Sequence, residues 1–167
     1  PSGSASLGNL VWFDLNKDGL QSSVEPGVQG VTVTLYDAAE QVVGVTTTDA
    51  NGEYYFIGLI PDTYSVGFSN LPVGYAFTSR DADALGIDGS LNSDADTITG
   101  LTTTVTLFAG DNNLNLDAGI YTDIVAWLKE NNKIKIYSAS LEGEDVKVVG
   151  KLKEGILIIG NEANGVS

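Results

Sequence analysis

A run of oxygen-bearing side chains near the start of the chain has the spacing of a metal-binding loop. From position 14 the residues read Asp-x-Asn-x-Asp-Gly, and a Glu follows after five more positions. A calcium loop of the EF-hand type places its ligands in this order, because the chain wraps around a hard cation that takes six to eight oxygens. The predicted ligands are Asp14, Asn16, Asp18, the backbone carbonyl of Leu20, and Glu25.

Two more residues agree with this interpretation. Gly19 stands where such a loop turns sharply, and Ser22 stands where a water molecule often completes the shell. The alternative is a surface turn rich in Asn, Asp and Gly that binds no ion. Because the glycine and every ligand position match, we expect Ca²⁺ here.

A second acidic cluster lies between Arg80 and Gly100. Its carboxylates would repel one another without counter-ions, so a second metal site is the favoured interpretation, with a solvated acidic loop as the alternative. The spacing does not match one known loop, so the ligand set is less defined than in the first cluster. The candidates are Asp81, Asp83, Asp88, Asn92, Asp94 and Asp96.

The segments that flank the first loop predict strands and not the helices of an EF-hand. Residues 7–13 are short, β-branched and aromatic, and residues 26–35 alternate with period two. Further short apolar runs follow at regular spacing, separated by turn signals such as Asn51-Gly52, which favours a β-sandwich. The expected strands are 31–36, 42–48, 53–57, 63–68, 75–78, 102–108 and 114–120.

Composition excludes several classes of function. The chain has no Cys, Met or His, which removes disulfides, thiol nucleophiles and the usual general base. Its net charge of −14 argues against nucleic acid and anionic membranes as partners. The sequence shows no transmembrane run and no signal peptide, and residues 1–6 are expected to be a linker or a cloning remnant.

Charge divides the chain into two parts. Residues 1–121 hold 15 of the 22 acidic residues, and their only cations are Lys17 and Arg80. Residues 122–167 hold 6 lysines and 7 acidic residues. We therefore expect a domain at 7–121 and a separate extension at 122–167.

Several motifs of the first part resemble the B-type domains of Ser-Asp-repeat surface adhesins. The pattern opens with Leu10-Val11-Trp12-Phe13 and the calcium loop, and continues through Thr48-Asp49-Ala50-Asn51-Gly52. It includes Leu71-Pro72-x-Gly74-Tyr75 and closes with Asp117-Ala118-Gly119-Ile120-Tyr121. The resemblance covers about residues 7–121.

This resemblance implies an extracellular, calcium-braced, Greek-key sandwich of the immunoglobulin-like or prealbumin-like kind, related to the collagen-adhesin B domain. Such modules usually act as stalk units of cell-surface or secreted proteins. Related pilin-type domains carry an internal Lys–Asn isopeptide bond, but the one lysine here, Lys17, lies in the calcium loop. We therefore expect calcium to take the place of the isopeptide bond as the brace.

The extension is expected to be a small α+β unit that resembles no family. Thr122 can cap a short helix whose apolar stripe includes Trp127, and this stripe is better explained as core than as a binding site. Strands are expected at 133–137, 146–149 and 155–160. The apolar run Ile156–Ile159 needs a partner strand, either within the extension, which we favour, or in another copy.

Three functional hypotheses follow. The favoured one is a calcium-stabilised spacer or assembly unit of a bacterial surface adhesin or filament, whose partners are calcium and neighbouring domains or copies. The alternative is a glycan- or protein-binding module, in which Tyr54, Tyr55, Tyr64 and Tyr75 could stack on sugars. An enzyme such as a glycosidase is the weakest, because the carboxylates already have calcium spacing and no nucleophile–base pair is visible.

Overall fold

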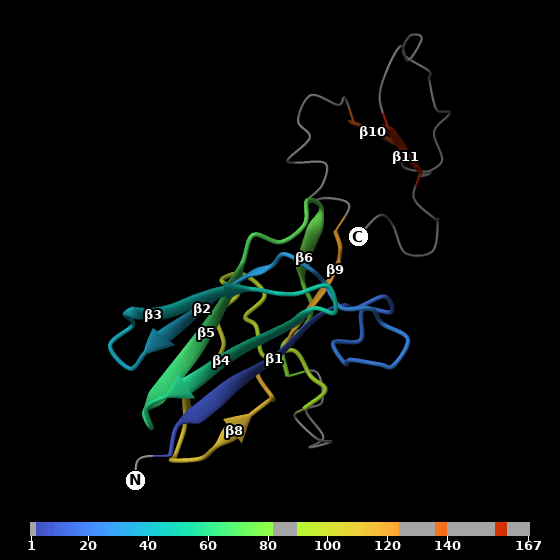
Figure 1. Cartoon of the computed structure of the whole chain (residues 1–167). Helices are drawn as coiled ribbons and strands as arrows, with labels where there is room; N and C mark the ends of the chain where they lie inside the picture. Colours follow the sequence, from blue (N-terminus) through green and yellow to red (C-terminus); the bar gives the residue numbers. More distant parts are fainter. Residues whose placement is uncertain (1–2, 82–89, 124–135, 140–155, 160–167) are drawn as a thin grey trace. The chain divides into compact units, whose positions relative to one another are not determined.

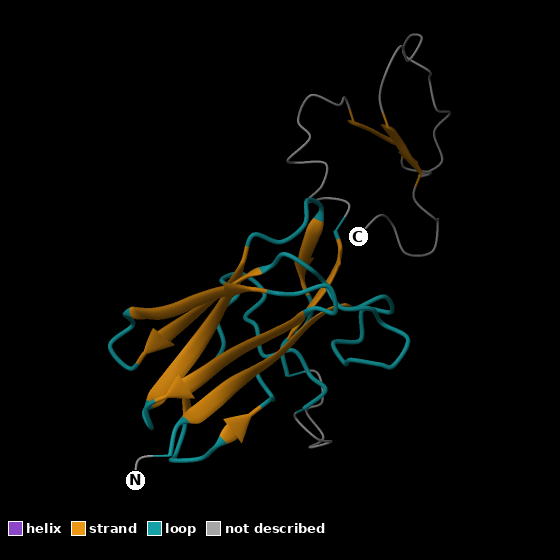
Figure 2. Cartoon of the chain, in the orientation of Figure 1, coloured by secondary structure: helices purple, strands orange, loops and turns teal. Residues whose placement is uncertain are grey.

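The computed structural model describes residues 3–81, 90–123, 136–139 and 156–159. The chain divides into two compact units, Pro1–Asp123 and Ile124–Ser167. Within the described ranges every regular element is a strand (Figure 2), and no helix is long and apolar enough to span a membrane. The strands of the first unit are β1 (Ala5–Phe13), β2 (Thr32–Asp37), β3 (Val42–Thr47), β4 (Glu53–Leu59), β5 (Thr63–Ser69), β6 (Tyr75–Phe77), β7 (Val105–Thr106), β8 (Asn112–Asn113) and β9 (Ala118–Thr122).

Two sheets form the first unit (Figure 1). The first has the order β4-β1-β9-β6, with β8 also paired to β1. Strand β1 is antiparallel to β4 and parallel to β9, so the first and last strands of the unit lie together. The second sheet has the order β3-β2-β5-β7, and its pairs are antiparallel. The β-sandwich predicted from the alternating runs is therefore confirmed.

The core lies between the inward faces of these sheets. Alternation along each strand directs one set of side chains inward, as in Val33 and Leu35 of β2 or Val66 and Phe68 of β5, which are all at most 2% exposed. The Tyr54 ring of β4 meets Phe68 edge-on across the sheets, with ring centroids 5.6 Å apart. Trp12 of β1 and Ile120 of β9 are 0% exposed, and the predicted calcium loop begins just beyond Trp12, after Phe13.

The turn between β3 and β4 has the chemistry that its sequence predicts. The Asp49 carboxylate accepts the N–H groups of Asn51 and Glu53 at 2.8 and 2.9 Å, which is an Asx-type turn around the predicted Asn51-Gly52 signal. Gly52 has a φ of +81°, and a Cβ there would lie 2.3 Å from the Val11 carbonyl oxygen. Only glycine can bring this turn so close to β1.

Most predicted strands have their ends within two residues of the observed ones, and three differences have a physical reason. The first strand begins at Ala5, which is 1% exposed, so residues 5 and 6 belong to the sheet. Of the expected strand 102–108 only Val105–Thr106 is regular, because the Thr102 hydroxyl takes the Val66 N–H in place of a backbone carbonyl. Strand β9 starts at Ala118, because side chains of the preceding segment, such as the Asp117 carboxylate that binds the Leu10 N–H, replace ladder bonds.

The second unit contains a parallel strand pair. Strands β10 (Ile136–Ala139) and β11 (Ile156–Ile159) pair over four residues. The apolar run thus has a partner strand in its own unit, which is the arrangement we favoured from the sequence. Thr122, expected to cap a helix, is the last residue of β9, while the expected Trp127 helix and the strand 146–149 lie outside the described residues.

Candidate metal centre

The loop predicted to bind calcium begins where β1 ends. Asp14 follows Phe13 directly, and its backbone N–H donates to the Ile120 carbonyl of β9 at 2.8 Å. On the return path the Phe13 N–H donates to the Pro26 carbonyl at 2.9 Å. Both ends of the loop are therefore anchored to the first sheet.

Asp14 is the most enclosed of the predicted ligands, at 2% exposed. Its Oδ2 accepts the Gly19 N–H at 2.9 Å, and its Oδ1 accepts the Asp18 N–H at 3.2 Å. The hydroxyl of Thr78, beyond the end of β6, also donates to Oδ2. These bonds fix the orientation of the carboxylate and draw the loop around it.

The middle of the loop is a short exposed network. The Asn16 amide donates to Asp18 Oδ2 at 2.7 Å, and Asn16 Oδ1 accepts the Asp18 N–H at 3.2 Å. Lys17 between them has a φ of +61° and Gly19 has a φ of +77°, so the chain reverses sharply at the position predicted for the turn. The Lys17 ammonium lies 4.7 Å from the centre of the Tyr121 ring. It forms no ion pair with the described carboxylates of the loop.

Glu25 closes the loop. This side chain is 9% exposed, and its Oε1 accepts the Leu15 N–H at 2.8 Å. Its Oε2 accepts both the N–H and the hydroxyl of Ser22, at 2.8 and 3.1 Å. The last predicted ligand is thereby held beside the first residues of the loop, as ligands of one ion would have to be.

The residue types and their burial fit a bound cation. In the described part of the chain the only salt bridge is Arg80–Asp81, so the nearly buried carboxylates of Asp14 and Glu25 have no side-chain cation. Burial of an uncompensated carboxylate is costly, and a hard cation would compensate both. As described, however, the oxygens face N–H groups, and no cluster of three or more Asp or Glu side chains is close enough to hold one ion among the described residues.

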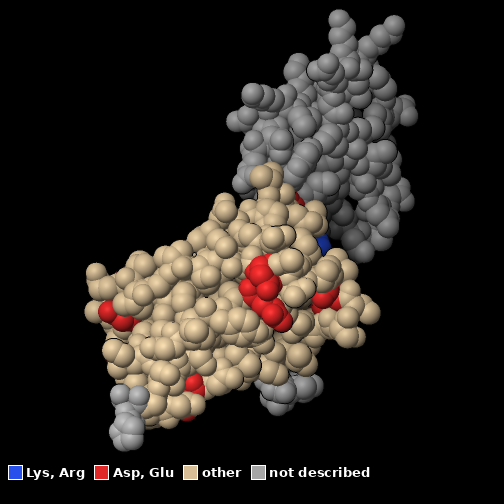
Figure 3. Space-filling view, viewed as in Figure 1, with Lys and Arg blue, Asp and Glu red and all other residues tan. Residues whose placement is uncertain are grey.

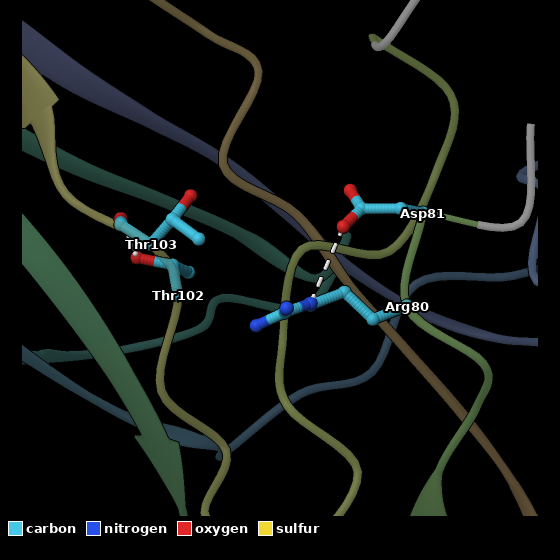
Figure 4. Close-up of polar contacts among 4 residues, drawn as sticks. All are labelled: Arg80, Asp81, Thr102 and Thr103. Atoms are coloured by element: carbon cyan, nitrogen blue, oxygen red, sulfur yellow. Dashed lines mark hydrogen bonds and ion pairs between the residues drawn. The ribbon is translucent and has the colours of Figure 1, made fainter. Parts of the chain in front are cut away.

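The second acidic cluster is divided among several roles. Asp83 and Asp88 lie outside the described residues. Asp81, with a φ of +50°, forms an ion pair with Arg80 at 3.3 Å between Nε and Oδ2 (Figure 4). Asp96 accepts the Thr99 and Ile98 N–H groups of its own turn, and these bonds lower its pKa.

Asn92 and Asp94 instead connect with other parts of the fold. Asn92 is 6% exposed and bridges to Leu20 of the first loop. Beside it the Gln21 N–H donates to the Leu91 carbonyl at 2.7 Å. The two acidic segments, separate in sequence, are therefore hydrogen-bonded to each other, which the ligand spacing alone did not reveal.

Asp117 is an important polar residue that the sequence analysis placed in a strand. It is 1% exposed, its Oδ1 accepts the Leu10 N–H at 2.9 Å, and its own N–H donates to Asp94 Oδ2 at 2.8 Å. Burial, with a smaller contribution from the charge of Asp94, raises the pKa of Asp117 to about 8 despite the bond from Leu10. The available signal was a lone carboxylate within the apolar segment 114–120.

An open cavity of about 320 Å³ lies beside the loop. Phe13, Tyr75 and Tyr121 supply aromatic walls, and Asp14 and Lys17 supply charged groups at the loop side. The Phe13 and Tyr75 rings pack 5.1 Å apart and account for part of this surface. The cavity adjoins the candidate metal centre and is part of the same end of the sandwich.

Comparison with known proteins identifies the class of domain that this sandwich and loop define. The profile of the SdrD B-like domain matches residues 5–120. The chain is 39% identical over 160 residues to serine-aspartate repeat-containing protein E of Staphylococcus aureus strain Mu50, and 46% identical over 116 residues to protein C of strain N315. The chain therefore belongs to the SdrD B-like domain family.

The extent of these matches differs. The alignment with protein E covers 92% of this chain and therefore extends past Tyr121, whereas that with protein C covers 70%. The chain spans only 13% and 11% of these two relatives. Among solved structures, the minor pilin GBS52 of Streptococcus agalactiae matches with a TM-score of 0.43 and 15% identity, over 72% of this chain and 44% of that one.

Proposed function

We propose that residues 7–121 act as a calcium-stabilised spacer module that separates functional parts of a longer surface protein. The observation that carries this proposal is the pair of nearly buried carboxylates, Asp14 and Glu25, held in a loop with calcium spacing and without a side-chain cation. Family membership supports the structural part of the proposal. The module has no catalytic role in this account.

The chain's own residues explain how such a loop would brace the sandwich. Asp14 is bonded through its N–H to β9 and through its carboxylate to Thr78 after β6. Glu25 holds the opposite end of the loop, next to the chain that leads into β2. Calcium, when bound, would supply positive charge to these acidic groups, with Asp14, Asn16, Asp18, Glu25 and the Leu20 carbonyl as its proposed ligands.

The contribution of the second acidic segment is a further part of the proposal. Asn92 and Asp94 are the described members whose contacts reach the first loop or Asp117, the residue before β9. Asp96 serves its own turn, and Asp81 is paired with Arg80, so these two are weaker candidates. We therefore expect a second ion, if it binds, to depend on Asp94 more than on Asp96.

A spacer must keep its length under load, and this property gives the test. Single-molecule extension of the full chain should show a higher unfolding force for the sandwich in calcium than in chelator, because bound calcium stabilises only the folded loop. A chain with Glu40→Gln, an exposed change outside both acidic clusters, should behave like the original. Equal unfolding forces with and without calcium would contradict the proposal.

The glycan-binding alternative has little support in the described residues. Tyr54 and Tyr64 are 2% and 7% exposed, and Tyr75 packs on Phe13. Tyr55 is 47% exposed, but its ring covers the position where Gly8 lacks a side chain. A glycan array with the full chain would favour this alternative only if a signal is lost in Tyr55→Ala.

A further inference from the structure

Strand β3 is an open edge of the second sheet. The order β3-β2-β5-β7 leaves one side of β3 without a partner strand in the described part of the chain. Three of its residues, Val42, Val43 and Val45, are 58%, 51% and 61% exposed. Proteins normally protect an edge of this kind with lysine, proline or a very short strand, and β3 has six residues and neither lysine nor proline.

The backbone of β3 can accept another strand. The Thr48 N–H donates to the Val31 carbonyl at 3.0 Å, which fixes the phase of the antiparallel β2–β3 ladder. Because bonded residues alternate along such a ladder, the N–H and C=O groups of Val45 and Thr47 are directed away from β2. They form a short row of main-chain donors and acceptors at the edge.

The other edges of the sandwich are less suitable. Strands β6 and β7 have three and two residues. Strand β4 carries Glu53, ends near Gly58 with a φ of +73°, and uses Tyr55 to cover Gly8. The β3 edge therefore combines length, apolar side chains and a regular backbone in a way that the others do not.

Charge at the two ends of β3 indicates what would bind there. The strand itself is uncharged, but Asp37 at the end of β2 and Glu40 in the turn precede it, and the turn after it carries Asp49. The carboxylates of Asp37 and Asp49 are fixed by hydrogen bonds to Gln41 and Asn51. Acidic atoms on the face shown in Figure 3 likewise lie in separate spots with broad uncharged areas between them.

We propose that β3 binds an extended polypeptide segment whose uncharged, β-branched centre is flanked by lysine or arginine. The centre of the segment would pair with the β3 backbone and cover the exposed valines, and its basic ends would meet the acidic turns. A second copy of this domain is a poorer partner, because antiparallel pairing of two β3 strands would bring the acidic turns of the two copies together. This surface is separate from the calcium loop and adds a docking role to the proposed spacer.

The test uses the full chain and a synthetic peptide with the sequence Lys-Lys-Val-Thr-Val-Thr-Val-Lys-Lys. Titration should show saturable binding that weakens with added salt, because the basic ends contribute electrostatically. A peptide with Glu in place of each Lys, and one with Pro in place of the central Val, should bind at least about tenfold more weakly. Failure of the Lys-flanked peptide to saturate would overturn the proposal.

Two protein variants locate the site. Val45→Lys places a cation on the β3 edge and should weaken peptide binding at least about tenfold. Ile57→Lys makes the same change on β4, where Ile57 is 79% exposed, and should leave binding unchanged. Equal effects of the two variants would contradict a site at β3.

A measurement on the unmodified chain does not depend on how the variants fold. Hydrogen exchange of the Val45 and Thr47 amides should slow when the peptide is added, because these N–H groups then donate to it. Exchange in β4 should not change. Unchanged exchange at β3 would overturn the proposal and show that the peptide does not dock there. A dimer in light scattering that is lost in Val45→Lys would overturn it in favour of self-association.

Discussion

At the scale of single residues, the candidate metal centre depends on carboxylates whose positions are already fixed by N–H groups. Asp14 and Glu25 accept bonds from Gly19, Leu15 and Ser22, so much of the loop geometry exists before an ion is considered. The remaining negative charge of two nearly buried groups is what calcium would compensate. Substitution of one carboxylate therefore tests the ligand assignment while most of the loop's hydrogen bonds are kept.

Glu25→Gln should reduce the number of bound calcium ions by one. The amide keeps one oxygen for a backbone N–H but presents an NH₂ group toward either Leu15 or Ser22, which should cost about 1–3 kcal/mol of stability in addition to the lost ion. Calcium counting after equilibrium dialysis and urea unfolding measure the two effects. Glu40→Gln is the matched control, and an unchanged ion count in Glu25→Gln would show that Glu25 is not a ligand.

Asp117 predicts an unusual dependence of stability on pH. Its pKa is about 8 in the folded chain against an ordinary value of 3.8, so the folded state binds more protons than the unfolded state between these pH values. This contribution is fully present below about pH 4 and is lost as pH rises toward 8. In chelator, where no calcium affects the Asp94–Asp117 contact, Asp117→Asn should remove this slope.

Urea unfolding midpoints at pH 5, 6.5 and 8 would measure this effect. As pH rises, the unfolding midpoint of the original chain should fall relative to that of Asp117→Asn. The asparagine can keep its oxygen toward the Leu10 N–H, so the bond to β1 need not be lost. Parallel pH profiles for the two chains would refute the assignment.

At the scale of elements, the turns determine how the two sheets meet. Gly52→Ala should destabilise the sandwich strongly, by roughly 3 kcal/mol or more, because it adds both an unfavourable positive φ and a Cβ at 2.3 Å from the Val11 oxygen. Gly30→Ala is the matched control: its φ is +84°, but its Cβ would meet no atom within 4 Å. It should cost only about 1 kcal/mol in thermal or urea unfolding. Equal costs for the two variants would show that the contact with β1 does not matter.

Sequence periodicity predicted most of the sandwich because alternation reports directly on which face of a strand is buried. Strands β2 to β5 lie where their apolar alternation placed them. The boundaries after residue 100 could not be read in this way, because Thr102 and Asp117 use side chains to bind the backbone of β5 and β1. A side-chain bond that replaces a backbone bond leaves the apolar pattern of the sequence unchanged, so it is seen only in the structure.

Ligand spacing predicted the candidate site less completely. It identified the loop at 14–25 and its turn at Gly19, because local order within twelve positions determines how a short loop folds. It did not show that Leu91 and Asn92 bond to Gln21 and Leu20, since this contact spans about seventy positions. It also missed Thr78, whose hydroxyl reaches Asp14 from the end of β6.

At the scale of the whole molecule, acidic charge and fold support one interpretation of the first unit. Residues 1–121 carry fifteen carboxylates and two cations, so they gain little from internal ion pairs, and the described residues among them form one. Its stability must come from the core between the sheets and, in our proposal, from bound calcium. The second unit is a separate body with its own parallel strand pair, and the proposed brace does not involve it.

Thermal unfolding of the full chain in calcium and in chelator is the most direct test of the proposed calcium brace. Calcium at one hundred times its dissociation constant should stabilise the sandwich by about 2.7 kcal/mol for each site, because it binds the folded loop and not the unfolded chain. Magnesium at the same concentration should have a smaller effect, since it is bound less readily by a cage made only of protein oxygens. A higher melting temperature in calcium, reversed by chelator, is the predicted result, and the same melting temperature in both solutions would contradict the account.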